Sequence, residues 1–294
     1  MLVNLRDITA IAEQNNMAIG AFNVPSFEAL RAVIDAAEET GYPVIIAHAE
    51  AHENVVPLEK IGPAMVALAD RSSAQICVHL DHCEDLAYMR QALEMGFTGI
   101  MYDGSTLPYE ENLANSRRAA AMVANFDCGL ECELGSMGAR ENGAGHEDEE
   151  TGDTPAQYTD PAQAEAFIRD SGLDILACSF GTVHGLYIGE PHLDFDVLRN
   201  IRKRSLTPLV MHGGSGVSDE DYVEAINAGI RKVNYYTYGA MYAGDAVRAT
   251  IKSYEAKNPD SIVYWHDMTT AAYDSYLTTV TKVMKVFANG AKPQ

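Results

Sequence analysis

The sequence has 294 residues, of which 47% are hydrophobic, and its 42 acidic and 21 basic residues give a net charge of −21. A chain of this length can form two small domains or one α/β barrel, and it buries roughly three quarters of its unfolded surface. The acidic balance excludes nucleic acid and anionic membranes as partners, because phosphate contacts require clustered Lys and Arg. An anionic metabolite stays open, since a metal ion and a few local groups can bind one.

The segment from Met1 to Asn16 lacks the basic start and the long apolar core of a signal peptide. No apolar run approaches the ~20 residues of a membrane span. The five cysteines are odd in number and form no C-x-x-C motif. We therefore expect a reduced, cytoplasmic protein without a disulfide framework.

A short apolar run followed by a longer segment of helical periodicity recurs along the chain. Strands are predicted for the eight apolar runs at residues 18–24, 43–49, 75–81, 99–104, 129–135, 175–181, 208–214 and 232–237. Helices are predicted between them at residues 26–40, 57–70, 84–95, 108–124, 161–171 and 218–228. Eight alternating units predict an α/β protein with a (β/α)8 TIM barrel, as a single domain over residues 1–294. A doubly wound open sheet is the alternative, but no G-x-G-x-x-G motif follows the first strand.

Residues at the predicted helix ends support these bounds. Ser26, Asp160 and Ser218 stand where an N-cap side chain accepts a backbone N–H group. Gly41 and Gly96 follow predicted helices, where a left-handed residue commonly ends a helix.

Two segments lie outside the repeat. Residues 136–158 are rich in Gly and acid and lack periodicity, which is typical of a lid or binding loop, or of a solvated acidic surface loop. The tail from Trp265 to Ala288 has apolar positions at helical spacing. It predicts one or two additional C-terminal helices, packed against the barrel or against a partner subunit.

Polar side chains gather at the carboxyl ends of the predicted strands, where barrels of this type carry their chemistry. They are Asn23 in the first strand, Asp81 and His82 at the third, Asp103 at the fourth, Glu131 and Glu133 in the fifth, His184 after the sixth, His212 in the seventh, and Asn234 and Thr237 in the eighth. Three histidines on one rim match the ligand set of a catalytic zinc site, whereas each histidine alone is more often structural. The remaining histidines are alternative ligands: His48, His52, His79, His146, His192 and His266.

Two short motifs on the same rim suit a phosphate group. Gly213-Gly214-Ser215 and Asn234-x-x-Thr237 offer backbone N–H groups and hydroxyls after the seventh and eighth strands. A plain turn is the alternative interpretation of the glycine pair.

Five ordered motifs carry a resemblance to a known family. They are HLDH at 79–82, YDGS at 102–105, ECELG at 131–135, GTVHGLY at 181–187 and HGGSG at 212–216. The chain resembles the class II, zinc-dependent ketose-bisphosphate aldolases of the fructose- and tagatose-bisphosphate type, from Ile19 to Asn234. The resemblance implies reversible retro-aldol cleavage of a ketose phosphate to dihydroxyacetone phosphate and an aldehyde. It also implies a homodimer or homotetramer, since relatives usually have one of these states.

The resemblance assigns roles by position. His82, His184 and His212 would bind one zinc ion per subunit, with a monovalent cation as a second candidate cofactor. Asp103 and Glu133 match an alternate metal site or a supporting shell. Asp81 would handle the proton of the hydroxyl beside the bond that breaks, and Glu141 would exchange a proton with the three-carbon donor. The predicted substrate-binding residues are Asn23, Gly185, Gly213, Ser215, Asn234, Tyr236 and Thr237.

The physical logic of metal chemistry agrees with these roles. A zinc ion can stabilise the negative charge of an enediolate, so that no lysine Schiff base is needed. Lys60, Lys203 and Lys232 are the lysines nearest the barrel, and none stands convincingly at a strand's carboxyl end.

Several positions depart from the family pattern. They are Tyr236 in place of a small or acidic residue, Ala49 in place of Ser or Thr with His48 and Glu50 beside it, Ile188 where many fructose-bisphosphate enzymes have lysine, and Arg140 in place of an acid. We therefore hypothesise a modified substrate: a monophosphate, a sulfonated or deoxy analogue, or an intermediate of inositol breakdown.

Two other functional classes stay open for this chain. A non-catalytic barrel would keep the fold for binding or assembly, and a zinc metallohydrolase would need an H-x-H motif on the first strand, which has Phe22-Asn23-Val24 instead.

Overall fold

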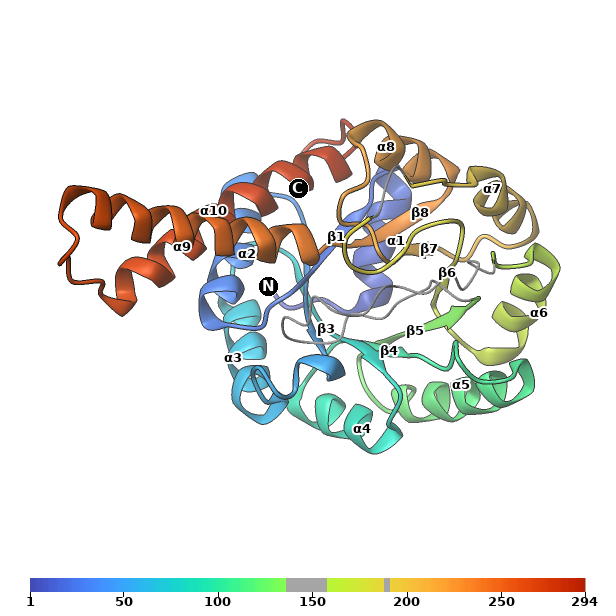
Figure 1. Ribbon diagram of the computed structural model, residues 1–294. Helices are drawn as coiled ribbons and strands as arrows, with labels where there is room; N and C mark the ends of the chain where they lie inside the picture. The colour runs from blue at the N-terminus through green and yellow to red at the C-terminus, as the bar shows by residue number, and fades with distance from the viewer. Residues whose placement is uncertain (136–157, 188–190, 294) are drawn as a thin grey trace.

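Eight parallel strands form a closed barrel in which each strand pairs with the next and β8 pairs with β1 (Figure 1). The computed structural model describes residues 1–135, 158–187 and 191–293. The strands are β1 (Ile19–Asn23), β2 (Val44–Ala49), β3 (Ile76–Cys83), β4 (Gly99–Tyr102), β5 (Gly129–Leu134), β6 (Ile175–Cys178), β7 (Leu209–Met211) and β8 (Ile230–Asn234). The predicted TIM barrel is confirmed.

The helices of the described residues are α1 (Leu5–Asn15), α2 (Phe27–Thr40), α3 (Leu58–Arg71), α4 (Leu86–Met95), α5 (Tyr109–Val123), α6 (Pro161–Ser171), α7 (Phe195–Arg204), α8 (Asp219–Ala228), α9 (Thr237–Lys257) and α10 (Trp265–Phe287), with a 3-10 turn η1 (Glu50–His52). They form three groups: α1 precedes β1, α2 to α8 follow strands β1 to β7 and surround the barrel, and α9 and α10 come after β8 (Figure 1). Helix α10 confirms the C-terminal extension expected between Trp265 and Ala288.

Alternation along the strands divides the core into two layers. Ile45 and Cys77 belong to a cluster inside the barrel, which also contains Leu5 of α1. Their neighbours Ile46 and Val78 belong to the cluster between the strands and the surrounding helices. Because both faces of every strand are buried, the strands read as continuous apolar runs in the sequence.

The predicted helix caps are present. The Ser26 side chain accepts the N–H of Ala29, and Asp160 accepts the N–H of Ala162. Gly41 ends α2 with φ of 71°, in the left-handed region that glycine adopts without strain.

The structure corrects several predicted bounds. β3 continues two residues beyond its predicted end at Asp81, through His82 to Cys83. β7 ends at Met211, which leaves His212 in the following loop. β8 begins at Ile230, two residues earlier than predicted, because the charged residues that follow Ile230 point to partners inside the fold and not to solvent.

Three helices, α1, α7 and α9, have no counterpart among the predicted elements. The polar helix α7 buries only Leu198 and Ile201, and α9 buries only Gly239. Helix α9, with so narrow a buried face, leaves little apolar periodicity in the sequence, whereas α1 and α7 are amphipathic and their periodicity was missed. Among the described residues, no helix is long and apolar enough to cross a membrane.

Helix α9 and the first half of α10 extend from the barrel as a helical hairpin (Figure 1). Its tip carries the exposed apolar side chains of Ile262, Tyr264 and Trp265. The second half of α10 is anchored on the barrel, with Val280 and Phe287 buried. The expected packing of the tail on the barrel is confirmed for this half, and a contact between subunits stays a prediction.

We expect Phe287→Ala to lower the free energy of unfolding by about 3–5 kcal/mol, because it leaves a cavity in a close-packed core. The Phe287 ring is fully buried, and its centroid lies 4.9 Å from that of Tyr222. Urea unfolding followed by circular dichroism measures the change. The control Leu206→Ala, at an 82% exposed position, should shift the free energy by about 0.5 kcal/mol or less. Equal effects of the two substitutions would contradict this anchoring.

Candidate active site

A local irregularity of β3 places two adjacent side chains at the mouth of the barrel. In a regular strand, neighbouring residues point to opposite faces. The β3–β4 ladder shifts register between Leu80 and Cys83, and His82 has φ of 45°, in the left-handed region. This strained conformation, which costs about 1–3 kcal/mol, lets Asp81 and His82 serve the same site.

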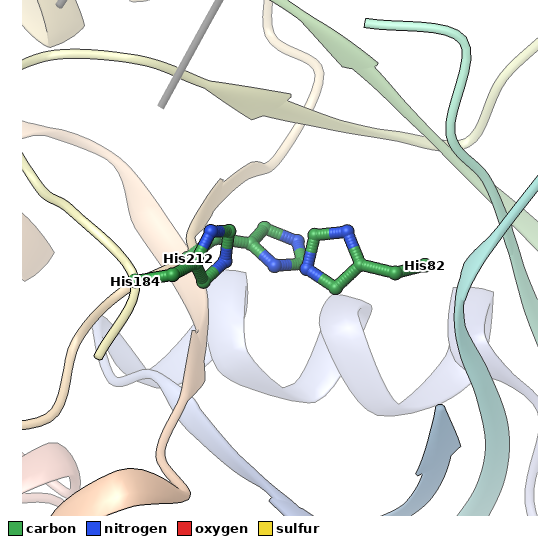
Figure 2. Close-up of side chains that lie close together, drawn as sticks. All are labelled: His82, His184 and His212. Atoms are coloured by element: carbon green, nitrogen blue, oxygen red, sulfur yellow. The ribbon is translucent and has the colours of Figure 1, made fainter. Parts of the chain in front are cut away.

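Three histidines from three strand ends converge there (Figure 2). One ring nitrogen from each of His82, His184 and His212 lies within 4.8 Å of the others. The ring centroid of His82 lies 4.9 Å from that of His184 and 4.4 Å from that of His212. Three imidazole nitrogens at this spacing are suited to zinc.

His184 provides the clearest sign of a missing partner. Both of its ring nitrogens are buried and have no hydrogen-bond partner among the described residues. Burial, followed by the positive charge on His82, lowers the pKa of His184 well below its ordinary value. A neutral imidazole with an unpaired buried nitrogen fits a metal ion, because a buried polar atom without a partner is otherwise costly.

Carboxylates next to His82 make the site attractive to a cation. His82 Nδ1 lies 2.9 Å from Asp103 Oδ2 and 4.0 Å from Glu133 Oε2. Burial by itself lowers the pKa of His82, but these carboxylates and that of Asp81 raise it to about 10. His82, Asp103 and Glu133 also form a second group whose ligand atoms lie within 4.8 Å of one another. The two groups share His82, as an alternate metal position would.

The charges of the two carboxylates differ. Burial raises the pKa of Asp103, but its hydrogen bond with His82 outweighs burial and lowers the pKa to about 2. Burial and the neighbouring Asp103 carboxylate raise the pKa of Glu133 well above its ordinary value. Asp103 therefore carries the negative charge, and Glu133 is poised to hold a proton until a cation binds.

Asp81 is buried beside the histidines and held by two amide groups. Asn23 Nδ2 donates to its Oδ2 at 3.2 Å, and Asn234 Nδ2 donates to its Oδ1 at 2.9 Å. Burial raises the pKa of Asp81, but the charges of His82 and Lys232 outweigh burial and hold it well below its ordinary value. The side chain is thus an ionised proton acceptor of fixed orientation.

His212 is oriented from beneath by Glu131. The His212 Nε2 atom lies 2.6 Å from Glu131 Oε1, and both side chains are fully buried. Burial raises the pKa of Glu131, but the Lys232 ammonium and the bond to His212 lower it to about 2. His79, on the same face of β3 as Asp81, lies 3.4 Å from Glu131 Oε2, which matches a supporting role and not that of a ligand.

A small pocket opens beside the histidines. Its lining contains every residue predicted to bind substrate, together with Asp81, two of the histidines and Gly214: Asn23, Asp81, His82, His184, Gly185, Gly213, Gly214, Ser215, Asn234, Tyr236 and Thr237. The structure therefore brings together the zinc-ligand, acid/base and phosphate candidates that lie in its described residues.

The loop after β7 requires glycine and is fixed from one side. Gly213 has φ of 61°, and a Cβ atom there would lie 2.3 Å from the carbonyl oxygen of Val183. The Tyr187 hydroxyl donates to the Gly213 carbonyl at 2.8 Å, and the Tyr222 hydroxyl donates to the Gly214 carbonyl. Ser215 Oγ accepts the backbone N–H of Tyr236 at 3.0 Å, which joins this loop to the start of α9.

Aromatic and histidine side chains back the pocket at the residues that depart from the family pattern. The Tyr236 ring packs on that of His52, with centroids 4.9 Å apart. His48 points to α4, where its Nε2 atom lies 2.9 Å from the Tyr88 hydroxyl, which donates to Glu53 at 2.5 Å. Burial lowers the pKa of His48 to about 4, so that it is neutral.

Sequence reasoning did not assign roles to His52, Tyr88 or the Glu131–Lys232 pair. A signal existed for Glu131, because it alternates with Glu133 and so faces the barrel interior. None of the alternative histidines that the structure describes joins the three-histidine cluster. Glu141, Arg140, His146 and Ile188 lie outside the described residues, so that their predicted roles and departures stay predictions.

Comparison with known proteins gives the relationship of the whole chain. The family model for class II fructose-bisphosphate aldolase matches residues 3–292. The YdjI aldolase from Escherichia coli K12 has 30% sequence identity and a TM-score of 0.85, and the match covers 100% of both chains. A provisionally assigned fructose-1,6-bisphosphate aldolase from Coccidioides immitis has 25% identity and a TM-score of 0.82, with 98% of this chain and 97% of that chain covered.

A fructose-bisphosphate aldolase from Campylobacter jejuni shares the fold, with a TM-score of 0.76 at 22% identity over 97% of this chain and 95% of that one. The family model spans nearly the whole sequence, and its match includes all the strands that carry the candidate site. The chain belongs to the class II fructose-bisphosphate aldolase family.

Proposed function

We propose that this protein is a zinc-dependent aldolase that reversibly cleaves a ketose phosphate to dihydroxyacetone phosphate and an aldehyde. The convergence of three histidines beside a buried, ionised Asp81 carries the proposal. Family membership supports aldol chemistry, and the site supplies the groups for it. A monovalent cation as second cofactor stays a prediction.

His82, His184 and His212 would hold the metal ion. When bound, zinc supplies Lewis-acid stabilisation of the negative charge that develops on the substrate oxygen as the carbon–carbon bond breaks. The imidazole set, the orphaned nitrogens of His184 and the surrounding carboxylates all fit a dication.

Asp81 accepts the proton of the hydroxyl next to the breaking bond. Asn23 and Asn234 hold its two oxygens, which fixes the direction from which it takes the proton. Loss of that proton turns the hydroxyl into the aldehyde carbonyl, and the bonding electrons pass to the three-carbon donor. We assign the return of a proton to the donor carbon to Glu141.

The donor's phosphate would bind at the opposite side of the pocket. Gly185, Gly213 and Ser215 contribute backbone and hydroxyl groups there, and α9 begins at Thr237. The first N–H groups of a helix have no partner within the helix and favour an anion. Phosphate binding at this position would orient the ketose with its carbonyl toward the histidines.

The residues that line the pocket favour a substrate other than fructose 1,6-bisphosphate. None of the pocket-lining residues that the structure describes is Lys or Arg. Tyr236, backed by His52, adds an aromatic surface where a charged distal phosphate would need cationic partners. We infer a ketose with one phosphate and an uncharged or modified distal end.

An activity assay on the zinc-loaded protein tests the proposed function. Ketose phosphates are supplied one at a time, and dihydroxyacetone phosphate is measured with a coupled dehydrogenase. We expect at least one monophosphate or modified ketose to be cleaved faster than fructose 1,6-bisphosphate. A chelator should abolish cleavage and added zinc should restore it, whereas borohydride with substrate should leave the enzyme active. Trapping by borohydride would mean a Schiff base and refute the metal mechanism, and rapid cleavage of fructose 1,6-bisphosphate would refute the modified substrate.

Two substitutions separate proton transfer from metal binding. We expect Asp81→Asn to retain about one zinc ion per chain and to lose about 10²–10⁴-fold in turnover, because the base is removed. His184→Ala should lose the zinc, while His266→Ala, at an exposed histidine, should keep both zinc and turnover. Elemental analysis after dialysis gives the zinc content. Full zinc occupancy in His184→Ala would refute the ligand assignment.

A further inference from the structure

Beneath the three histidines, the barrel interior holds a lysine that the proposed reaction does not use. Lys232 in β8 is fully buried, as is Glu131 in β5. Lys232 Nζ lies 2.8 Å from Glu131 Oε2 and donates to Asn234 Oδ1 at 2.7 Å. Burial of an ammonium group lowers the stability of the fold unless the group is paired. The two contacts of Lys232 therefore raise the question of what this buried charge does.

We propose that Lys232 is a positioning residue that fixes which atoms of Asn234 and His212 face the reaction centre. It acts through two arms, a hydrogen bond to Asn234 and an ion pair with Glu131. The inference rests on the proposed function, because it concerns the groups that would hold the metal ion and the base. Lys232 does not line the pocket, and its ammonium is engaged with two acceptors, so it is not a nucleophile for a Schiff base.

The first arm sets the orientation of the Asn234 amide. A lysine ammonium has hydrogen-bond donors only, so the oxygen end of the amide must face Lys232. The amide nitrogen is thereby directed to Asp81 Oδ1 at 2.9 Å and to His212 Nδ1 at 3.0 Å. A flipped amide would place its carbonyl oxygen against the Asp81 carboxylate, which is repulsive. Lys232 thus selects the rotamer that supports the base.

The second arm sets the tautomer of His212. Glu131 Oε2 lies 2.8 Å from the Lys232 ammonium, which leaves Oε1 to accept a hydrogen from His212 Nε2, 2.6 Å away. The His212 lone pair is then on Nδ1, the atom that lies 3.0 Å from Asn234 Nδ2. Carboxylates that accept the second N–H of a metal-binding histidine fix its ring and raise its basicity. Lys232 lies 2.8 Å from the other oxygen of this carboxylate and so fixes its orientation inside the barrel.

Both arms predict the same consequences for Lys232→Met, which keeps the length of the side chain and removes its charge and donors. The zinc dissociation constant, measured by competition with a chromophoric chelator, should rise about 10–100-fold, as for other second-sphere losses. Turnover of the zinc-saturated variant should fall while KM changes little, because the Asn234–Asp81 bond is loosened and the phosphate contacts are not.

Arg231→Met is the matched control, because it removes the neighbouring cation of the same strand. Arg231 pairs with Glu13 at 2.7 Å and donates to the carbonyl oxygens of Ile226 and Ile230, and none of these hydrogen bonds involves Asn234 or Glu131. We expect this variant to lose stability while it retains the zinc affinity and turnover of the unmodified protein. Equal losses of zinc affinity in Lys232→Met and Arg231→Met would mean that Lys232 only stabilises the fold. That result would overturn the proposal.

Nitrogen NMR of the unmodified protein labelled in histidine tests the second arm without a substitution, and therefore does not depend on whether Lys232→Met folds. The His212 signal should show a proton on Nε2 and none on Nδ1, and Glu131→Gln should disturb this pattern. A proton on Nδ1 in the unmodified protein would overturn the proposal.

If the unmodified protein binds no zinc and cleaves no ketose phosphate, the proposed function itself fails. If it does both and Lys232→Met matches it, only the role of Lys232 fails.

Discussion

The site depends on one residue in an unfavourable backbone conformation. A straight parallel strand would send Asp81 to the barrel interior and His82 to the helix layer, and metal ligand and base would then be separated. The left-handed φ of His82, together with the register shift beside it, brings both side chains to one mouth. The rest of the barrel makes this strain tolerable, because β2 and β4 hold β3 on both sides. The arrangement that we assign to catalysis is therefore stabilised by the fold and would not form locally.

Charge is the second constraint. Four buried carboxyl groups lie around the three histidines. They belong to Asp81, Asp103, Glu131 and Glu133. Four acids in a dry interior need positive charge, and the protein supplies it in two layers. Lys232 neutralises the lower layer, around Glu131. In the upper layer the carboxylates of Asp81, Asp103 and Glu133 outweigh burial and raise the pKa of His82 to about 10, and a dication would replace the proton that they favour. Metal affinity and the placement of Lys232 are thus two parts of one electrostatic balance.

The strands could be predicted because each is buried on both faces and reads as an apolar run, and the rim histidines because they follow those runs. Two kinds of feature could not. Helix α9 buries too few residues to show a period, and the bulge at His82 depends on pairing across β3 and β4. The pairing of Lys232 with Glu131 could not be predicted, since only barrel closure brings the two side chains together. The contact between the Tyr236 and His52 rings likewise joins segments that are far apart in the sequence.

The central claim is that one metal ion binds His82, His184 and His212 together. The most direct test is a crystal of the zinc-loaded protein with diffraction recorded on both sides of the zinc absorption edge. We predict one anomalous peak per chain, at roughly 2.0–2.1 Å from one ring nitrogen of each of the three histidines. A sole peak among His82, Asp103 and Glu133 would place the resident ion in the alternate group and contradict the claim. A protein with full aldolase activity and no anomalous peak at either group would contradict the metal mechanism as a whole.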